Sequence, residues 1–274
     1  MDRECGAEIS PQATTPVMGI LQSSRPQEDV PRHRHVESAK SSKETMIVPA
    51  IEASLWDYLV SCIAVKPNDQ IARHNMKIIT ITGYKGGCGK SMTAVHVATF
   101  FSDRGNTLLV DSDPNRTALH WSDRGSLPFE VVDERKAMKS VAGRDWVVID
   151  TPARPDSSDL KELSEGADLL ILPTVPDIVS LDPMLQTASA LGKANYRALL
   201  TIVPPRPSKE GETMRDELRD NGVPVFETMI RRAAGFQKAA LAGVPVREMG
   251  GRDSLGWMDY QSLGKEILEV IGDE

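Results

Sequence analysis

From residue 76 onward, short apolar runs alternate with longer segments in which apolar residues recur at helical spacing. The apolar runs cover 78–81, 108–110, 146–149, 169–172 and 199–203. They are nearly continuous instead of alternating, which is typical of strands buried on both faces of a parallel sheet. The segments with helical spacing cover 90–104, 157–165, 183–193, 209–220, 233–242 and 258–271. This order predicts one doubly wound α/β domain, with a mostly parallel sheet flanked by helices.

The first 75 residues differ from the rest of the chain. Ser, Pro, Gln, Glu and Arg dominate residues 1–45, and the few apolar residues there follow no period. Such a segment buries too little apolar surface to offset the entropy of ordering the chain. We therefore expect a mostly disordered N-terminal extension over 1–75, with one amphipathic helix near 50–65 where the spacing becomes helical. The folded domain is expected to cover 76–274.

Composition and charge narrow the class of protein. The 274 residues are 40% hydrophobic and 26% charged, with a net charge of −7, so the chain as a whole is not a nucleic-acid-coating protein. No run approaches the roughly 20 apolar residues that a transmembrane helix needs, and the N-terminus has no secretory signal pattern. Cys5, Cys62 and Cys88 are too far apart in sequence for a CxxC metal pair. We expect a reduced, cytoplasmic protein.

A glycine-rich segment joins the first predicted strand to the first predicted helix. It reads Gly83-Tyr84-Lys85-Gly86-Gly87-Cys88-Gly89-Lys90-Ser91-Met92. Glycines let successive backbone N–H groups point at one anion, and the helix N-terminus adds its positive dipole. In such a loop Lys90 contacts the β- and γ-phosphates of a nucleotide and the Ser91 hydroxyl binds Mg²⁺. Tyr84 replaces the first glycine of the usual G-x-x-x-x-G-K-[ST] pattern, and Lys85 adds a second lysine.

This variant loop resembles the deviant phosphate loop of the ParA/MinD family of dimeric ATPases. Two further motifs lie where the resemblance requires them, namely Asp111-Ser112-Asp113-Pro114-Asn115 and Val147-Val148-Ile149-Asp150-Thr151-Pro152. The first is similar to the family's first switch, and the second to its Walker B segment and second switch. The resemblance covers 76–274 and is greatest to the short ParA proteins of plasmid partition. Gly83 and Met92 depart from the Asn and Thr often found in the family, which implies a looser grip on the nucleotide.

The resemblance implies a role for each motif. Residues 85–92 bind ATP, while Ser91 and, through a water, Asp150 hold Mg²⁺ with support from Asp111. Asp113 orients the attacking water. Lys85 reaches across a two-fold interface to the phosphates of the partner's ATP, so ATP holds a sandwich homodimer together and ADP releases it. From the residues alone, Asp111 and Asp113 are also candidates for capping the helix that follows them.

The distribution of charged residues along the chain indicates whether DNA or a membrane is the expected partner. Residues 190–209 contain four bases and no acid, and residues 228–252 contain five bases and one acid. The DNA-binding candidates in these stretches are Lys193, Arg197, Arg231, Arg232, Lys238 and Arg247. The two stretches could form a focused basic patch or be scattered solvated side chains. Because few aromatic residues accompany them, contact with phosphates of any sequence is expected instead of base stacking. Residues 264–274 carry one base against four acids, so no contact with an anionic membrane is expected.

We therefore expect an ATPase that dimerises on ATP, binds nucleoid DNA without sequence preference and moves a cargo. Its partner would be a ParB-like or adaptor protein that stimulates slow hydrolysis. A plasmid is the first cargo to consider, with carboxysomes, chemoreceptor arrays or chromosome loci as alternatives. The other class of function is a small-molecule P-loop enzyme of the same fold, although the biotin-pathway synthetase that resembles this domain lacks the second loop lysine.

Overall fold

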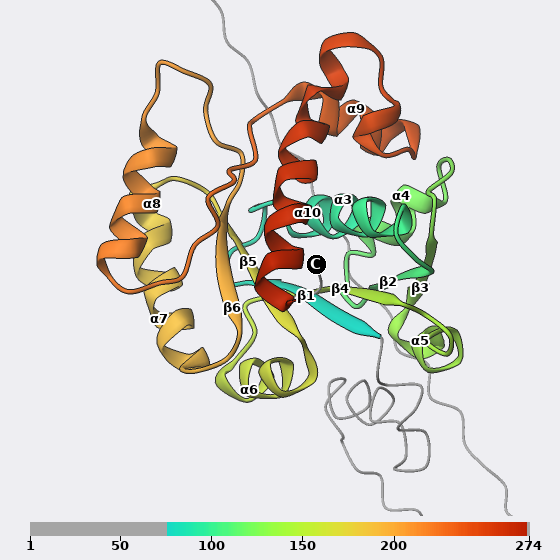
Figure 1. The fold of residues 1–274 in the computed structure, drawn as a ribbon, viewed down its shortest axis with the longest axis horizontal. Coiled ribbons are helices and arrows are strands. Elements are labelled where there is room, and N and C mark those ends of the chain that lie inside the picture. Colours follow the sequence, from blue (N-terminus) through green and yellow to red (C-terminus); the bar gives the residue numbers. More distant parts are fainter. Residues whose placement is uncertain (1–75, 273–274) are drawn as a thin grey trace, which may run out of the picture. The chain divides into compact units, whose positions relative to one another are not determined.

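The computed structural model describes residues 76–272, which form a layered α/β domain. Within this range, a six-stranded parallel sheet has the strand order β3-β2-β4-β1-β5-β6 (Figure 1). The strands are β1 (Lys77–Gly83), β2 (Thr107–Asp111), β3 (Glu130–Asp133), β4 (Trp146–Ala153), β5 (Leu169–Thr174) and β6 (Tyr196–Leu200). The helix expected near 50–65 lies outside the described residues.

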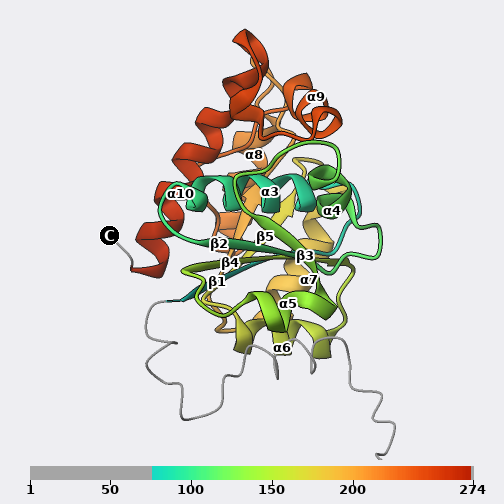
Figure 2. The same ribbon diagram turned by 90° about the vertical axis from the view of Figure 1, so that its right-hand side faces the viewer.

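Helices cover both faces of this sheet (Figure 2). One face carries α3 (Lys90–Ser102), α4 (Thr117–Ser122), α9 (Ala234–Ala242) and α10 (Trp257–Ile271). The other carries α5 (Glu134–Ser140), α6 (Ser157–Gly166), α7 (Leu181–Leu191) and α8 (Glu210–Asp220). Among the helices of residues 76–272, none has both the length and the apolar character that crossing a bilayer demands.

Alternate residues of each central strand belong to two separate hydrophobic clusters. In β1, Ile79 and Ile81 pack on the α3 side, whereas Ile78 packs on the side of α5 to α8. On the α3 side, the ring of Phe101 stacks on Trp146 with centroids 4.0 Å apart. Fully burying each such side chain contributes about 1.5–3 kcal/mol, so both faces must be apolar. This explains the nearly continuous apolar runs.

The fold class expected from the sequence is confirmed, and the differences are confined to short elements. The strand β3 and the helices α4 and α5 were not predicted, because β3 offers only Val131 and Val132 between acids and both helices are short. The strand expected over 199–203 instead covers 196–200. Ile202 takes a left-handed φ of 54°, which a β-strand cannot accommodate.

Candidate functional site

The predicted phosphate loop joins the carboxyl end of β1 to the amino end of α3. Gly87 and Gly89 have φ values of 76° and 86°, a left-handed backbone that favours glycine. A Cβ on Gly86 or Gly87 would meet no atom within 4 Å, so the loop is open on its outer side. No side chain caps the start of α3 and its first turn carries no acid. The first N–H groups of this helix can therefore bind an anion.

Contacts from the last strand and within the loop fix its shape. The Thr201 hydroxyl, which follows β6, donates a 2.7 Å hydrogen bond to the carbonyl of Cys88. The Cys88 thiol donates to the Lys85 carbonyl at 3.1 Å. Cys88 is buried, and this burial raises the pKa of its thiol. Cys88 thus contributes structure and backbone groups to the loop and has no features of a reactive thiol.

The buried carboxylate of Asp150 lies beside the start of α3. Asp150 occupies β4 directly opposite Asp111 of β2, and neither of its oxygens has a hydrogen-bond partner among residues 76–272. Burial raises the pKa of Asp150 to about 7, and the negative charges of Asp111 and Asp113 add to this effect. The nearby Ser91 side chain and the positive charge of Lys90 lower the pKa and so oppose the shift. Lys90, the first residue of α3, is itself buried. An unpartnered buried carboxylate is costly, so this position is built for a cation or its water ligands.

The side-chain oxygens at this position suit a magnesium ion that binds together with a nucleotide. Mg²⁺ prefers oxygen ligands and usually keeps several waters while binding one or two protein groups and phosphate oxygens. Asp150 and the Ser91 hydroxyl provide such oxygens beside the loop that faces the phosphates. In the described part of the chain, no group of three or more His, Cys, Asp or Glu side chains could hold a metal without a nucleotide.

Asp111 holds the backbone of the segment that follows β2. Its two oxygens accept hydrogen bonds from the N–H groups of Asp113 at 3.2 Å and Leu119 at 3.0 Å. Asp111 thus has the capping role that the sequence left open, and it also lies opposite Asp150 in the sheet. In Asp113, Oδ1 accepts from the backbone and side-chain amides of Asn115 at 2.9 and 2.8 Å. Its Oδ2 accepts no hydrogen bond from a described residue and is the oxygen that could orient a water.

Arg116 and Glu134 brace this segment, and neither was predicted from the sequence. The Arg116 guanidinium donates to the Asp111 carbonyl and to both carboxylate oxygens of Glu134. The hydrogen bonds from Arg116 hold the pKa of the buried Glu134 below its usual range. An arginine directly after the Asp111–Asn115 motif was the available signal, but only the fold brings Glu134 to it.

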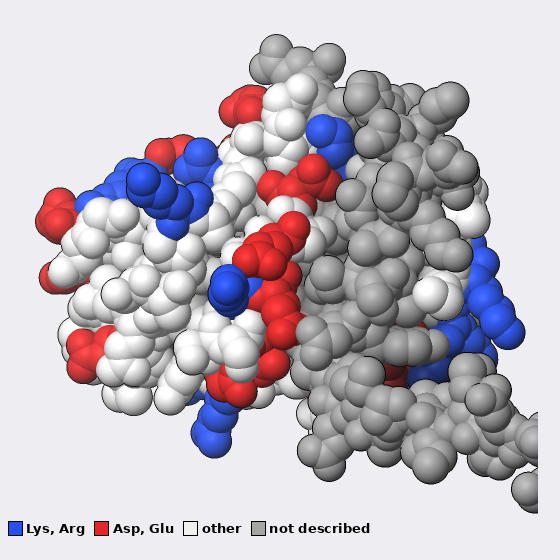
Figure 3. Space-filling model, turned by 90° about the horizontal axis from the view of Figure 1, so that it is seen from below, with Lys and Arg blue, Asp and Glu red and all other residues white. Residues whose placement is uncertain are grey.

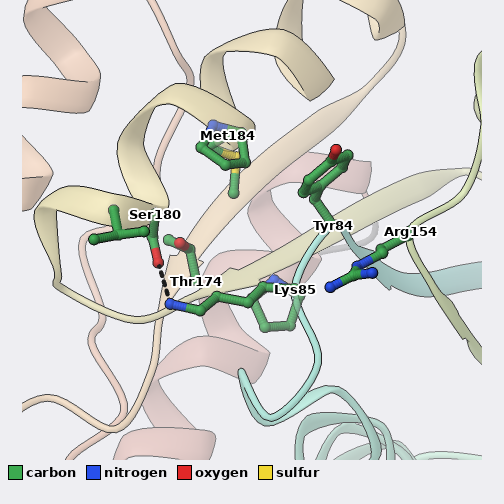
Figure 4. Close-up of a pocket in the computed structure, with 9 residues that line it drawn as sticks. Tyr84, Lys85, Arg154, Thr174, Ser180 and Met184 are labelled. Carbon is green, nitrogen blue, oxygen red and sulfur yellow. Dashed lines mark hydrogen bonds between the residues drawn. The ribbon is translucent and has the colours of Figure 1, made fainter.

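The second loop lysine is paired within its own chain. Lys85 Nζ donates to Asp177 Oδ2 at 3.0 Å and to the Ser180 hydroxyl at 3.3 Å, in the segment between β5 and α7. The contact with Ser180 is drawn in Figure 4. About half of each side chain of this ion pair is exposed, 46% for Lys85 and 43% for Asp177. Such an exposed pair is weak, so Lys85 can leave it for a stronger anion.

Lys85 lines a pocket between the start of the phosphate loop, the end of β4 and the segment from β5 to α7. Its lining residues are Tyr84, Lys85, Arg154, Pro173, Thr174, Val179, Ser180, Pro183 and Met184. The neighbouring surface is apolar, because Ile178 and Val179 are 79% and 70% exposed in the turn η2 (Ile178–Ser180) and Tyr84 is 43% exposed. Exposed aliphatic side chains that adjoin one another often mark an interaction surface.

The DNA-binding candidates are divided between two ends of β6. Lys193 precedes its amino end and Arg197 lies within it, whereas Arg231 and Arg232 pair with Val203 beyond its carboxyl end.

Three of the candidates are neutralised by ion pairs within the chain. Arg231 binds Asp259, Lys238 binds Asp253 and Arg247 binds Asp103, each with a contact of 2.6 Å. Lys193 and Arg232 have no ion pair with any residue of 76–272. On the face in Figure 3, Asp and Glu side chains separate the Lys and Arg groups. The largest group of Lys and Arg side chains, at the left of this view, is bordered by Asp and Glu side chains.

Comparisons with known proteins agree with this geometry. Residues 79–246 match the model of the CobQ/CobB/MinD/ParA nucleotide binding domain. The chain is 33% identical over 202 residues to "Maintenance of carboxysome distribution protein A" of Gloeobacter kilaueensis, a match that covers 70% of this chain and 94% of that protein. It is 27% identical over 179 residues to "Protein ParA" of Rhizobium radiobacter, covering 58% of this chain and 80% of that protein. Among solved structures, an ATP complex of Cyanothece McdA superposes with a TM-score of 0.56 at 16% identity, covering 73% and 98% of the two chains.

Proposed function

The chain belongs to the CobQ/CobB/MinD/ParA nucleotide-binding family, and on this premise we propose that it is an ATPase that dimerises around ATP to position a cellular cargo. The observation that carries this proposal is the pairing of an open phosphate loop with the buried, unpartnered carboxylate of Asp150. A purely structural loop has no need of a carboxylate held at such a cost. The second lysine, Lys85, supports a dimerising ATPase over a small-molecule enzyme.

The chemistry follows from where the side chains lie. Lys90 and the N–H groups of the loop would hold the phosphates, and Ser91 with Asp150 would hold Mg²⁺ and its water. When bound, Mg²⁺ would neutralise charge on the phosphates. Asp113, with Oδ2 directed to no described partner, would hold the attacking water in line with the γ-phosphate. Positioning and charge neutralisation supply most of the catalysis in phosphoryl transfer, so no covalent step on the protein is required.

Dimerisation would depend on Lys85. An ammonium paired with a half-exposed carboxylate exchanges it readily for a phosphate, which carries more charge. Lys85 would leave Asp177 when a second protomer brings its ATP, and hydrolysis would return the lysine to Asp177. The ATP-bound homodimer and the ADP-bound monomer would then be the two states of the cycle.

For the cargo, we propose carboxysomes or a similar large assembly, moved over nucleoid DNA with an adaptor protein. The support is the 33% identity over 94% of a protein named for carboxysome distribution. This reverses the preference for a plasmid that the motifs alone suggested. Plasmid partition with a ParB-like partner is the second candidate, supported by the match to Protein ParA.

Three variants test the ATPase cycle by sedimentation and phosphate release with ATP and Mg²⁺. Lys90→Ala should abolish nucleotide binding. Asp113→Ala should bind ATP and remain dimeric with little hydrolysis. Lys85→Ala should bind ATP but stay monomeric. If Lys85→Ala dimerises and turns over ATP like the wild type, the small-molecule enzyme becomes the better interpretation.

The cargo is tested in the source cells by deleting the gene. Restoring it with wild type should spread fluorescent carboxysomes evenly, whereas Lys90→Ala should leave them clustered. Evenly spread carboxysomes in the deletion strain, combined with loss of a plasmid, would favour partition.

A further inference from the structure

Arg154 is an unpaired cation in the pocket that contains Lys85. It lies at the carboxyl end of the sheet, directly after β4, and Figure 4 shows its guanidinium pointing toward the Tyr84–Lys85 segment. Lys85 is paired with Asp177, but the Arg154 side chain has no hydrogen bond or ion pair with any residue of 76–272. A guanidinium carries five donors, and this one leaves all of them available to a ligand.

The backbone holds Arg154 in this position despite an unfavourable conformation. Its φ is 62°, in the left-handed region that a glycine would occupy at less cost. Its N–H donates to the Gly83 carbonyl at 3.2 Å, which ties the end of β4 to the start of the phosphate loop. Strained backbones of this kind gather at functional sites, because the surrounding structure must hold them in place.

The chemistry of the pocket points to a phosphate ligand. Two cationic side chains, Lys85 and Arg154, enter it beside the apolar surfaces of Pro173 and Met184. An oxyanion with several negative charges would satisfy both cations, and the planar guanidinium matches two phosphate oxygens at once. Lys90, Ser91 and Asp150, which we propose hold this chain's own nucleotide, do not line the pocket. Phosphates bound in this pocket would therefore belong to a second nucleotide.

We propose that Arg154 binds, together with Lys85, the phosphates of the nucleotide held by the partner protomer. This inference rests on the proposed ATP-dependent dimer and adds a second residue that acts across its interface. The exposed Ile178 and Val179 beside the pocket are the apolar surface that a second copy of the chain would cover. Arg154 would thus add charge neutralisation at the partner's phosphates during hydrolysis.

Three substitutions at this position separate charge from backbone strain. Arg154→Ala and Arg154→Gly both remove the guanidinium, and glycine also relieves the strain. Both should lower ATP turnover and ATP-dependent dimerisation by about 10- to 100-fold, the usual effect of removing one charge-assisted hydrogen bond. Arg154→Lys should retain more of both than either. Arg252→Ala is the matched control, because Arg252 is exposed in the turn η4 (Gly251–Gly256) and has no ion pair with a residue of 76–272, and it should behave like the wild type.

A mixing experiment tests whether the contact is made across the interface. Asp113→Ala protein retains Arg154, and Arg154→Ala protein retains Asp113. Each protein alone should have low turnover, because it lacks one of the two residues. In a mixed dimer, the nucleotide on the Arg154→Ala protomer would have its own Asp113 and the partner's Arg154. Mixing the two proteins should therefore restore turnover to a substantial fraction of the wild-type rate.

Two results would overturn the inference. Wild-type turnover by Arg154→Gly would mean that the guanidinium contacts no phosphate. Absence of any recovery on mixing would mean that Arg154 acts on its own nucleotide or on none. Both differ from failure of the proposed function, in which the wild-type chain itself would neither bind ATP nor dimerise with it.

Discussion

The imidazole of His96 stacks on the ring of Tyr260, with centroids 4.8 Å apart and planes 19° apart. Its Nδ1 donates to the carbonyl of Met92 at 2.7 Å, and its Nε2 accepts the N–H of Val246 at 3.1 Å. Met92 lies in the first turn of α3, so His96 connects the helix of the phosphate loop to the C-terminal segment that covers it. Burial lowers the pKa of His96 to about 4, and the ring is neutral in the native state.

This histidine makes stability depend on pH. Between the ordinary pKa of 6.5 and about 4, the unfolded chain takes up a proton at this position and the native chain does not. The free energy of unfolding should therefore fall by about 3 kcal/mol as the pH is lowered from 7 to 4. Urea denaturation at several pH values measures this, and His96→Gln should remove that part of the slope. Equal slopes for wild type and His96→Gln would contradict the assignment.

The ion pair between Lys85 and Asp177 should slightly favour the monomer over the ATP-dependent dimer. Asp177→Asn frees Lys85, so the ATP-dependent dimer should become tighter by a fewfold, in line with an exposed ion pair of about 0.2–1 kcal/mol. Sedimentation with ATP at several protein concentrations measures the change. Asp123→Asn, which removes another exposed acid, should have no effect. A weaker dimer with Asp177→Asn would instead indicate that Asp177 contributes to the interface.

The buried carboxylate of Asp150 should cost stability in the absence of ligands. Its pKa of about 7 means that ionisation at pH 8 is unfavourable, so Asp150→Asn should raise the free energy of unfolding by up to about 4 kcal/mol. The same variant should lose the Mg²⁺ dependence of ATP binding. Asp111→Asn is the informative contrast, because Asp111 accepts two backbone hydrogen bonds and its replacement should destabilise the domain. A destabilised Asp150→Asn protein would show that Asp150 has a structural partner.

The exposed aliphatic side chains of η2 should be buried on dimerisation. The double change Ile178→Ser and Val179→Ser should weaken the ATP-dependent dimer by tenfold or more, because burying each side chain contributes about 1.5–3 kcal/mol. ATP binding by the monomer should not change. Leu241→Ser, on the outer side of α9 with Leu241 75% exposed, is the matched control. If both proteins dimerise equally well, the interface lies elsewhere.

Any DNA binding should depend more on basic side chains without an ion pair than on those that an acidic residue already neutralises. Arg232→Ala should weaken binding to every duplex equally and reduce the dependence of log affinity on log salt by about 0.9 for each phosphate that the protein no longer neutralises. Lys238→Ala should have a smaller effect, because Asp253 already neutralises Lys238 at 2.6 Å. Affinity measured at several salt concentrations, with ATP binding measured in parallel, makes this comparison. An effect limited to one DNA sequence would contradict binding to the phosphate backbone.

The sequence alone determined the sheet type, the loop and the order of the motifs. Continuous apolar runs predict strands buried on both faces, and Lys85, Lys90 and Ser91 are identified by their spacing in one short segment. These features are local, so they can be predicted without knowing the fold. β3 could not be predicted, because its pairing with β2, and not its own apolar content, stabilises it.

The tertiary structure decided what each side chain contacts. Asp111 and Asp150 both end apolar strands in the sequence, yet the former accepts two backbone hydrogen bonds and the latter none. Asp177 is 92 residues from Lys85 in sequence but forms its ion pair. The packing of β1 between β4 and β5 brings Arg154 to the same pocket. Such contacts join distant segments whose residues carry no shared local pattern, so only the folded chain reveals them.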